Sequence, residues 1–337
     1  MVDNVIILAA GKGNRMKSRD VNVSKFAYTI LGKPMINYVI DAVKRLSPKR
    51  IITVVGFGGD STIACINNET EIVWQKELLG TGHAIRQTEK LIGEEKGTTL
   101  VVCGDTPLIT TETLESVIHK HEKFKNQLTF VTSILDNPSG YGRVIREEKS
   151  NVVLGIKEEK RCSEDDLYIK EVNSGVYVFD NEVLFKYLNI QKKKNKDIND
   201  FNVTELAKML VDDKLRVRAY VLIEPTDVFS VDDHFQLAYA TKVIRKRTNT
   251  EFMISGVSIE DPDTAYISPL AVIGRDTIIK PNTTIIGNTV IGAGNVIGPN
   301  TVLDNVIIGK ENHIFESHIE NTKIGNKQII GPFKYIK

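Results

Sequence analysis

The stretch Leu8-Ala9-Ala10-Gly11-Lys12-Gly13-Asn14-Arg15-Met16 decides how the fold of this chain is interpreted. It follows the apolar run Val5-Ile6-Ile7, which predicts a buried strand. Gly11 and Gly13 have no Cβ, so the backbone there can turn sharply and come close to a ligand. The pattern therefore predicts a buried strand that ends in a ligand-binding turn.

The chemistry of this turn suits phosphate. Its peptide N–H groups can converge on phosphate oxygens, and Lys12, Arg15 and Lys25 bring positive charge close to it. The turn is neither a Walker A loop nor the GxGxxG dinucleotide fingerprint, because the third glycine and the Gly-Lys-Ser/Thr ending are missing. An ordinary strand-to-loop turn with solvated basic residues is the alternative.

Composition narrows the class of protein. The 337 residues are enough for two domains, and a net charge of +1 does not indicate binding to nucleic acid or to an acidic membrane surface. Cys65, Cys103 and Cys162 lie far apart, which is typical of reduced thiols rather than of a disulfide framework. The N-terminus lacks a secretory pattern, and no apolar run reaches membrane-spanning length. We therefore expect a cytoplasmic protein.

The first two-thirds of the chain alternates apolar runs with segments of helical period. This alternation predicts an α/β fold with a mostly parallel sheet and helices on both faces. The expected strands cover 4–9, 50–56, 71–75, 99–103, 127–133 and 172–179, and the expected helices cover 34–46, 59–67, 81–92, 111–124, 181–189, 203–211 and 231–247.

Candidate site residues follow several of these strands, and ligands of such sheets lie beyond the carboxyl ends of the strands. Gln75 follows the third strand, and Asp105 follows the fourth. Asp105 is a candidate Mg²⁺ ligand, because Mg²⁺ prefers one or two carboxylates together with phosphate oxygens. The alternative is a turn-forming aspartate before Thr106-Pro107. His83, in the second Gly-rich turn (79–84), is interpreted as a packing or capping residue.

From about residue 252 an aliphatic residue recurs every six positions. A fixed hexad predicts a parallel β-helix, in which each short strand stacks its aliphatic side chain on the coil below. An ordinary antiparallel β-domain would instead show period-two alternation and hairpin turns. The hexad residues are Ile267, Ile273, Ile279, Ile285, Ile291, Ile297 and Leu303, with the phase resumed at Ile308 and Ile314 and again at Ile324, Ile330 and Ile336.

Together, these motifs resemble the bacterial bifunctional enzymes that act as N-acetylglucosamine-1-phosphate uridylyltransferase and glucosamine-1-phosphate N-acetyltransferase. The resemblance extends over essentially the whole chain. The ordered motifs are Leu8-Ala9-Ala10-Gly11-x-Gly13-x-Arg15-Met16, Lys25, Gln75, Leu79-Gly80-Thr81-Gly82-His83-Ala84, Gly104-Asp105-x-Pro107-Leu108, Gly140-Tyr141-Gly142-Arg143 and Glu171-Val172-Asn173-Ser174-Gly175.

The resemblance implies a Rossmann-like nucleotidyltransferase domain (1–230), a connecting helix (231–250) and a truncated left-handed β-helix (251–337) that forms a homotrimer. It also implies a Mg²⁺-dependent reaction of UTP with N-acetylglucosamine 1-phosphate, which gives pyrophosphate and UDP-N-acetylglucosamine, a precursor of cell-wall and amino-sugar polymers. The implied nucleotide-binding residues are Leu8, Ala9, Ala10, Gly11, Gln75, Gly80, Thr81 and Gly104. The implied catalytic residues are Arg15 and Lys25, the sugar-binding residues Gly140, Glu158 and Asn173, and the metal ligands Asp105 and Asp232.

The sequence also departs from the family pattern. Asp232 stands where the family has its second metal ligand, an asparagine, so oxygen ligation is kept and a negative charge is added; the alternative is that Asp232 caps the following helix. Cys103 replaces a tyrosine, residues 199–204 replace a Tyr-rich segment, and Asp20-Val21-Asn22 lengthen a loop. These departures leave open a nucleotidyltransferase for another sugar phosphate or nucleotide, or a non-catalytic paralogue that binds UDP-sugar or serves assembly.

The family's β-helix continues beyond the position matched by Lys337, and its acetyl-coenzyme A site and acetyl-transfer histidine lie in the later coils. The resemblance therefore implies no acetyltransferase activity for this chain. His313 and His318 lie in early coils and are interpreted as surface or turn residues.

Overall fold

The computed structural model describes residues 2–16, 23–66, 68–148, 150, 152–194, 201–222 and 224–337. By compactness the chain divides into unit 1, Met1–Tyr28 with Met35–Asp233, and unit 2, Thr29–Pro34 with His234–Lys337. The domain limits expected from the sequence (1–230, 231–250 and 251–337) stay a prediction, because compactness alone does not show which segments fold independently.

A mixed sheet forms the centre of unit 1. Its described strands are β1 (Asn4–Ala9), β4 (Arg50–Val55), β5 (Glu71–Trp74), β6 (Thr98–Cys103), β7 (Leu128–Ile134), β8 (Arg143–Arg146), β9 (Val153–Lys157), β10 (Glu171–Asp180) and β11 (Val217–Val221). They follow the order β11-β7-β10-β6-β1-β4-β5, with β8 and β9 beside β10. β1 runs parallel to β4 and β6, β4 to β5, and β7 to β11. The predicted Rossmann-like α/β fold is confirmed.

The sheet differs from a parallel one at β10, which runs antiparallel to both β6 and β7. The chain reaches β10 through the antiparallel pair β8 and β9. An antiparallel strand needs no crossover helix, and this explains how β10 can reverse direction here. β8, β9 and β11 were not among the strands expected from the sequence.

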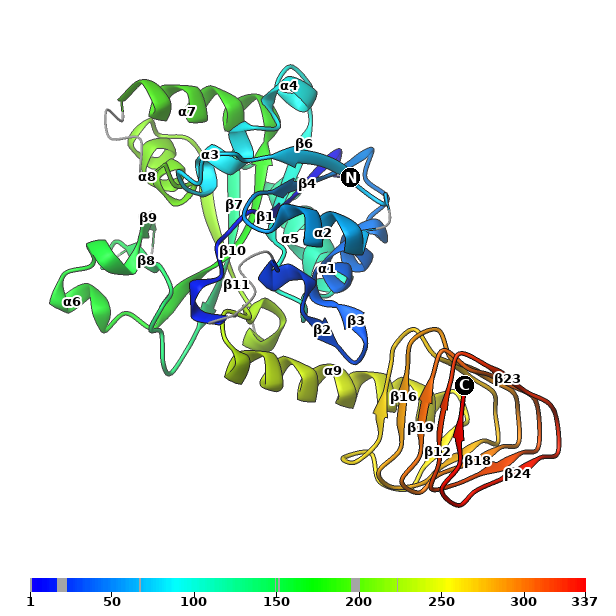
Figure 1. Cartoon of the computed structure of the whole chain (residues 1–337). Coiled ribbons are helices and arrows are strands. Elements are labelled where there is room, and N and C mark those ends of the chain that lie inside the picture. Colours follow the sequence, from blue (N-terminus) through cyan, green and yellow to red (C-terminus); the bar gives the residue numbers. More distant parts are fainter. Residues whose placement is uncertain are drawn as a thin grey trace. The chain divides into compact units, whose positions relative to one another are not determined.

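Helices cover both faces of this sheet. Successive side chains of β1 point to opposite faces, so the strand contributes to the core under each layer of helices. Val5 and Ile7 pack with residues of α1, α2 and α5, whereas Ile6 and Leu8 pack with residues of α3, α7 and α8 (Figure 1). The expected helix over 81–92 is two short helices. The helices of unit 1 are α1 (Met35–Lys44), α2 (Gly59–Ile66), α3 (Thr81–Arg86), α4 (Glu89–Ile92), α5 (Thr111–Phe124), α6 (Glu164–Leu167), α7 (Asn181–Lys194) and α8 (Thr204–Asp212).

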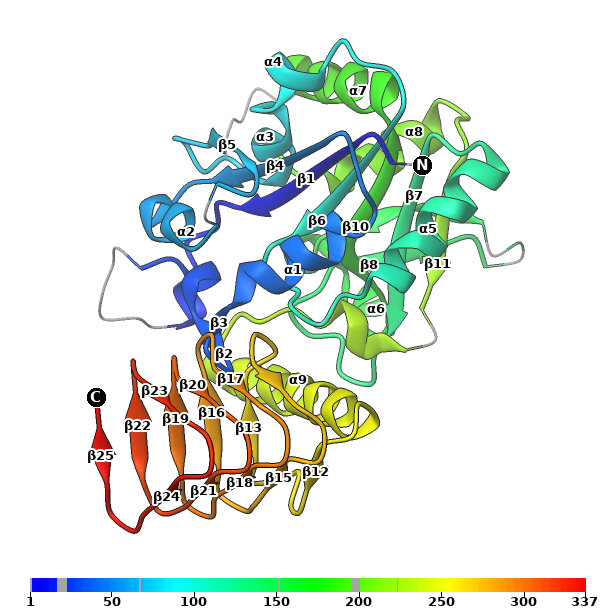
Figure 2. The ribbon, with the colours of Figure 1, turned by 90° about the vertical axis from the view of Figure 1, so that its right-hand side faces the viewer.

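Unit 2 holds the hexad residues in three stacks of short parallel strands. The stacks are β12-β15-β18-β21-β24, β13-β16-β19-β22-β25 and β14-β17-β20-β23. Figure 2 shows the strands of the second stack side by side. Ile267, Ile285, Leu303 and Ile319 stack inside the second, each fully buried. The predicted left-handed parallel β-helix of hexapeptide repeats is confirmed.

Unit 2 also contains a long helix and a small hairpin. The helix is α9 (His234–Ile254), and the hairpin consists of β2 (Thr29–Ile30) and β3 (Lys33–Pro34). None of the helices in the described part of the chain combines the length and apolarity that crossing a membrane requires.

The strands of the β-helix are β12 (Ser258–Ile259), β13 (Tyr266–Ile267), β14 (Val272–Ile273), β15 (Ile278–Ile279), β16 (Thr284–Ile286), β17 (Val290–Ile291), β18 (Val296–Ile297), β19 (Val302–Asp304), β20 (Ile307–Ile308), β21 (His313–Ile314), β22 (His318–Glu320), β23 (Lys323–Ile324), β24 (Ile329–Ile330) and β25 (Tyr335–Ile336).

Candidate functional site

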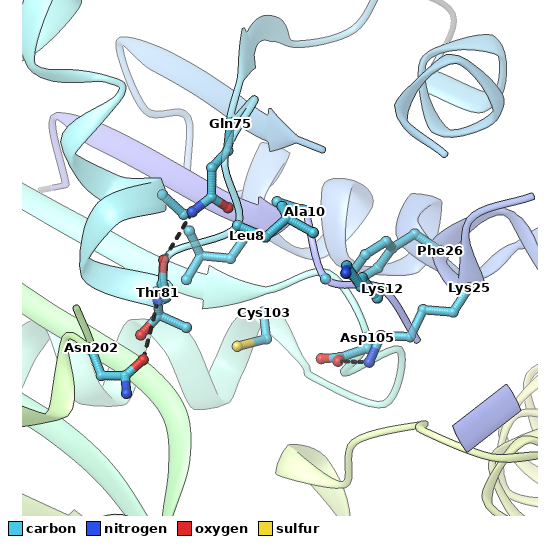
Figure 3. Close-up of a pocket in the computed structure, with 14 residues that line it drawn as sticks. Leu8, Ala10, Lys12, Lys25, Phe26, Gln75, Thr81, Cys103, Asp105 and Asn202 are labelled. Atoms are coloured by element: carbon cyan, nitrogen blue, oxygen red, sulfur yellow. Dashed lines mark hydrogen bonds and ion pairs between the residues drawn. The ribbon is translucent and has the colours of Figure 1, made fainter. Parts of the chain in front are cut away.

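A cavity of about 470 Å³ opens in unit 1, where the parallel strands β1, β5 and β6 end. Figure 3 shows the side chains that converge on it. Such an edge is the usual ligand position in an open α/β sheet. The lining residues are Leu8, Ala10, Gly11, Lys12, Lys25, Phe26, Gln75, Leu78, Gly80, Thr81, Ala84, Cys103, Asp105 and Asn202. Most of the predicted nucleotide-binding residues, together with Lys25 and Asp105, therefore meet at one cavity.

The Gly-rich turn leaves its backbone open at Gly11. A Cβ added to Gly11 would meet no atom within 4 Å, so a ligand can approach this peptide closely. Two other predicted nucleotide-binding residues do not line the cavity. Ala9 is fully buried in the core, and the Gly104 N–H donates to the Leu8 carbonyl oxygen at 2.9 Å, which ties the ends of β1 and β6 together.

Four charged side chains meet beside this turn. Lys25 Nζ lies 2.5 Å from Asp105 Oδ2 and 2.7 Å from Asp232 Oδ1, and Arg15 Nη2 lies 2.9 Å from Asp232 Oδ2. Burial opposes the charged ammonium of Lys25, but the attraction of the two carboxylates outweighs it and raises its pKa above the usual value. The predicted catalytic residues and the predicted metal ligands thus form one ion-pair network.

A backbone contact brings Asp232 to this network. The Val231 N–H donates to the Asp105 carbonyl oxygen at 2.8 Å, so the segment that carries Asp232 is fixed against the end of β6. The two carboxylates come close enough to share one cation, which in this structure is the ammonium of Lys25.

The donor chemistry also fits Mg²⁺, whose preferred ligands are carboxylate oxygens, phosphate oxygens and water. No group of three or more His, Cys, Asp or Glu side chains within the described ranges could hold a metal ion. A divalent ion at Asp105 and Asp232 would therefore complete its coordination with phosphate and water.

The other end of the cavity is built around Gln75. Its Nε2 lies 3.0 Å from the Gly80 carbonyl oxygen and 3.0 Å from His83 Nδ1. Gly80 has a φ of +115°, and a Cβ there would lie 2.5 Å from the Phe201 carbonyl oxygen, so this turn requires glycine. The predicted packing or capping role of His83 did not anticipate its contact with Gln75.

The segment that replaces the family's Tyr-rich stretch covers this turn. The Phe201 N–H donates to the Leu79 carbonyl oxygen at 2.9 Å, and Asn202 lines the cavity. Asn199 and Asp200 of that segment lie outside the described residues, as do Asp20-Val21-Asn22 of the lengthened loop.

The predicted sugar-binding residues do not line the cavity. Asn173 Nδ2 donates to the Tyr177 hydroxyl at 2.6 Å, and Glu158 Oε1 accepts from Thr204 Oγ1 at 2.7 Å. Burial, reinforced by the negative charge of Glu158, raises the pKa of Tyr177. Asn173 therefore contacts Tyr177, whereas Glu158 contacts Thr204. Gly140 lies next to Arg15, since a Cβ there would be 3.4 Å from Arg15 Nη1.

The sequence motifs assigned no role in the site to five residues that line the cavity, which are Phe26, Leu78, Ala84, Cys103 and Asn202. Phe26 follows Lys25, and the Lys25 ammonium lies 5.3 Å from its ring centroid. Adjacency to Lys25 was thus a usable signal for Phe26, whereas no local pattern marks Leu78. Asn202 belongs to the segment that departs from the family pattern, and this departure was the available signal.

Comparison with known proteins agrees with the fold. Residues 4–242 match the family described as nucleotidyl transferase, and residues 270–305 match the family described as bacterial transferase hexapeptide (six repeats). The chain is 39% identical to the bifunctional protein GlmU of Exiguobacterium sibiricum over 98% of this chain and 73% of that protein. It is 40% identical to that of a Geobacillus species and 37% identical to that of Bacillus subtilis, over 98% of this chain and 71% and 72% of those proteins.

Proposed function

The chain belongs to the nucleotidyl transferase family and, within it, to the GlmU proteins, and from this premise we propose that it is a uridylyltransferase. It joins UTP to N-acetylglucosamine 1-phosphate and releases pyrophosphate, with UDP-N-acetylglucosamine as the product. The observation that carries this proposal is a cavity lined by the open Gly11 peptide, Lys25, Asp105 and the buried amide of Gln75, with Asp232 and Arg15 joined to Lys25 in one ion-pair network.

The network suits transfer of a nucleotidyl group. The sugar phosphate is itself an anionic nucleophile, so the protein has to position two anions and neutralise their charge rather than supply a nucleophile. Lys25 and Arg15 are the cations beside the Gly-rich turn. Arg15 is 60% exposed and can therefore turn from Asp232 to a phosphate when substrate binds.

Mg²⁺ is the proposed cofactor, held by Asp105 and Asp232. When bound, the ion supplies further neutralisation of phosphate charge. Lys25, which pairs with both carboxylates in this structure, then becomes available to a phosphate oxygen. The negative charge that Asp232 adds relative to the family's asparagine is balanced by Arg15.

Gly140, Glu158 and Asn173 are the proposed residues for the sugar phosphate. Gly140 beside Arg15 gives the sugar phosphate room close to the cationic end of the site. Asn173 and Glu158 carry side-chain oxygens that accept hydrogen bonds, which suits the hydroxyl and amide groups of the sugar.

A homotrimer formed through the β-helix is also part of the proposal. Three aligned positions of one stack, Val272, Val290 and Ile307, expose 60%, 40% and 46% of their surface and form an apolar stripe along the helix axis. Such a stripe favours contact with another copy of the chain. Sedimentation at micromolar concentration tests this, and a monomer would contradict it.

The three sparse, free cysteines support the proposed cytoplasmic location.

An assay of pyrophosphate release tests the activity. With Mg²⁺, the protein should turn over UTP with N-acetylglucosamine 1-phosphate far faster than UTP with glucose 1-phosphate or dTTP with either sugar. Equal rates would instead support a nucleotidyltransferase of other specificity. Cys103 on the cavity wall favours this alternative, because it is smaller than the tyrosine of the family pattern and changes the space for substrate. Binding of UDP-sugar without any pyrophosphate release would support the non-catalytic paralogue.

A further inference from the structure

The orientation of the Gln75 amide is fixed by two hydrogen-bond acceptors. Its Nε2 is 3.0 Å from the Gly80 carbonyl oxygen, a group that can only accept, and 3.0 Å from His83 Nδ1. Gln75 is only 3% exposed, so water cannot replace either partner readily. With its nitrogen held on this side, the amide presents its carbonyl oxygen on the other. Figure 3 shows this oxygen on the side of Leu8 and Ala10, away from the dashed hydrogen bond of the amide nitrogen.

His83 accepts from Gln75 only as a neutral imidazole with a lone pair on Nδ1. Burial favours this form, because it lowers the pKa of His83 below its usual value. His83 Nε2 also lies 2.9 Å from Gln87 Nε2, and a neutral imidazole can accept at one nitrogen only. Gln87 Nε2 also donates to the His83 carbonyl oxygen at 3.1 Å. Gln87 is half-buried, so water can take the place of that partner, whereas Gln75 is buried. The Gln87 amide is therefore the one that rotates when His83 carries its lone pair on Nδ1.

A second set of contacts holds His83 itself. The N–H groups of Gly82 and His83 donate to the Phe201 carbonyl oxygen at 2.8 and 3.2 Å, and the His83 ring lies 6.4 Å from the Phe201 ring centroid to centroid. The imidazole is thus positioned from the start of α3 and from the segment at 201–203.

We propose that His83 is a positioning residue for base selection: it holds Gln75 with its carbonyl oxygen toward the cavity, so that the site accepts a base with a ring N–H and rejects one with a ring lone pair. Uracil presents an N–H at N3, whereas cytosine presents a lone pair at the same atom. If the amide turned round, its oxygen would face both the Gly80 carbonyl oxygen and the His83 lone pair. Without His83 only one of these repulsions remains. The inference rests on the proposed function, in that the cavity takes the base of a nucleoside triphosphate.

Equilibrium binding of nucleotides by His83 variants tests the inference. His83→Phe keeps a ring beside Phe201 and removes the acceptor, and His83→Ala serves if the phenylalanine variant does not fold. Gln87→Ala is the matched control, because it removes the partner of His83 Nε2 and leaves Nδ1 in place. Titration calorimetry with UTP, CTP and 3-methyl-UTP, which lacks the N3–H, measures the preference in each protein.

Wild type should bind UTP more tightly than CTP or 3-methyl-UTP. Loss of the acceptor should reduce the UTP-over-CTP preference by about tenfold, the value of one hydrogen bond, while Gln87→Ala preserves it. A wild-type preference in His83→Phe or His83→Ala, or an equal loss in Gln87→Ala, would overturn the inference. A wild-type protein that prefers UTP but releases no pyrophosphate would overturn the proposed function and leave the inference standing. A wild-type protein without preference for UTP would overturn the inference.

Discussion

Lys25 and Asp232, which are 207 residues apart in the sequence, form an ion pair with 2.7 Å between Nζ and Oδ1. The same ammonium lies 2.5 Å from Asp105 Oδ2. Two carboxylates and the cations of Lys25 and Arg15 balance in charge, so Asp232 does not leave an excess negative charge in this network. A metal ion held by Asp105 and Asp232, as proposed, would compete with Lys25 for the same two carboxylates.

Substitution of Asp232 tests its proposed role as a metal ligand. Asp232→Ala should lower activity by about a hundredfold or more at every Mg²⁺ concentration, nearly as much as Asp105→Ala, because a metal-held charge is worth several kcal/mol. Asp232→Asn keeps an oxygen ligand and should stay active, with a Mg²⁺ midpoint several-fold higher. Initial rates across a Mg²⁺ titration give both quantities. If Asp232→Ala retains the wild-type rate and midpoint, Asp232 is not a ligand and Asp233 is the next candidate.

Removal of Lys25 should make the stability of the protein depend on Mg²⁺. Lys25→Met leaves two close, partly buried carboxylates without their shared cation, which should lower the free energy of unfolding by about 3 kcal/mol in the absence of metal. Mg²⁺ should recover much of this loss, whereas it should change wild-type stability less. Urea denaturation with and without Mg²⁺ measures both effects. Lys12→Met is the control, since Lys12 is exposed at the same cavity and should show neither effect.

Gly11 offers a test of backbone approach that leaves the fold intact. A Cβ at Gly11 or at Gly325 meets no atom within 4 Å, so alanine at either position should keep the wild-type melting temperature. Gly11→Ala places a methyl group where the nucleotide approaches and should raise the KM for UTP by about tenfold or more, in line with the loss of one or more phosphate contacts. Gly325→Ala, in the β-helix, should leave the KM unchanged. Equal KM values in the two variants would remove Gly11 from the nucleotide site.

Local patterns of the sequence explain why most of the fold was predictable. The buried residues of β1 alternate between two cores, and the hexad residues stack coil upon coil, so period alone indicates both units. β10 was expected as a strand, but its direction was not predictable, because it depends on the β8–β9 pair before it. β8 and β9 are short, and Gly155 interrupts β9, so neither gives a clear alternating pattern.

Those residues of the site that belong to a single sequence motif were predictable. Gly11, Lys25, Gln75 and Asp105 belong to motifs of the resembling family, and all four line the cavity. Contacts between motifs were not predictable from spacing. The pairing of Asp232 with Lys25 depends on the bond between the Val231 N–H and the Asp105 carbonyl oxygen, and the orientation of Gln75 depends on His83. Such contacts become visible only when the chain has folded.

His121 should make the stability of unit 1 fall in mild acid. It lies on α5, is only 4% exposed, and its Nδ1 is 3.1 Å from Thr129 Oγ1. Burial lowers the pKa of His121 to about 4, although the charges of Asp180 and Glu122 partly oppose the shift. In the unfolded chain a histidine has a pKa of about 6.5.

Between these two pKa values the unfolded state takes up a proton that the folded state does not. The contribution of His121 to stability is therefore fully present above about pH 6.5, is lost as the pH falls, and reaches its limit near pH 4, with a total on the order of 3 kcal/mol. His121→Gln removes the titrating group, so the free energy of unfolding from urea denaturation should fall less between pH 7 and pH 4.5 than in wild type. His119→Gln, an exposed position on the same helix, should keep the wild-type pH dependence. Parallel pH profiles for wild type and His121→Gln would show that the buried imidazole does not control acid stability.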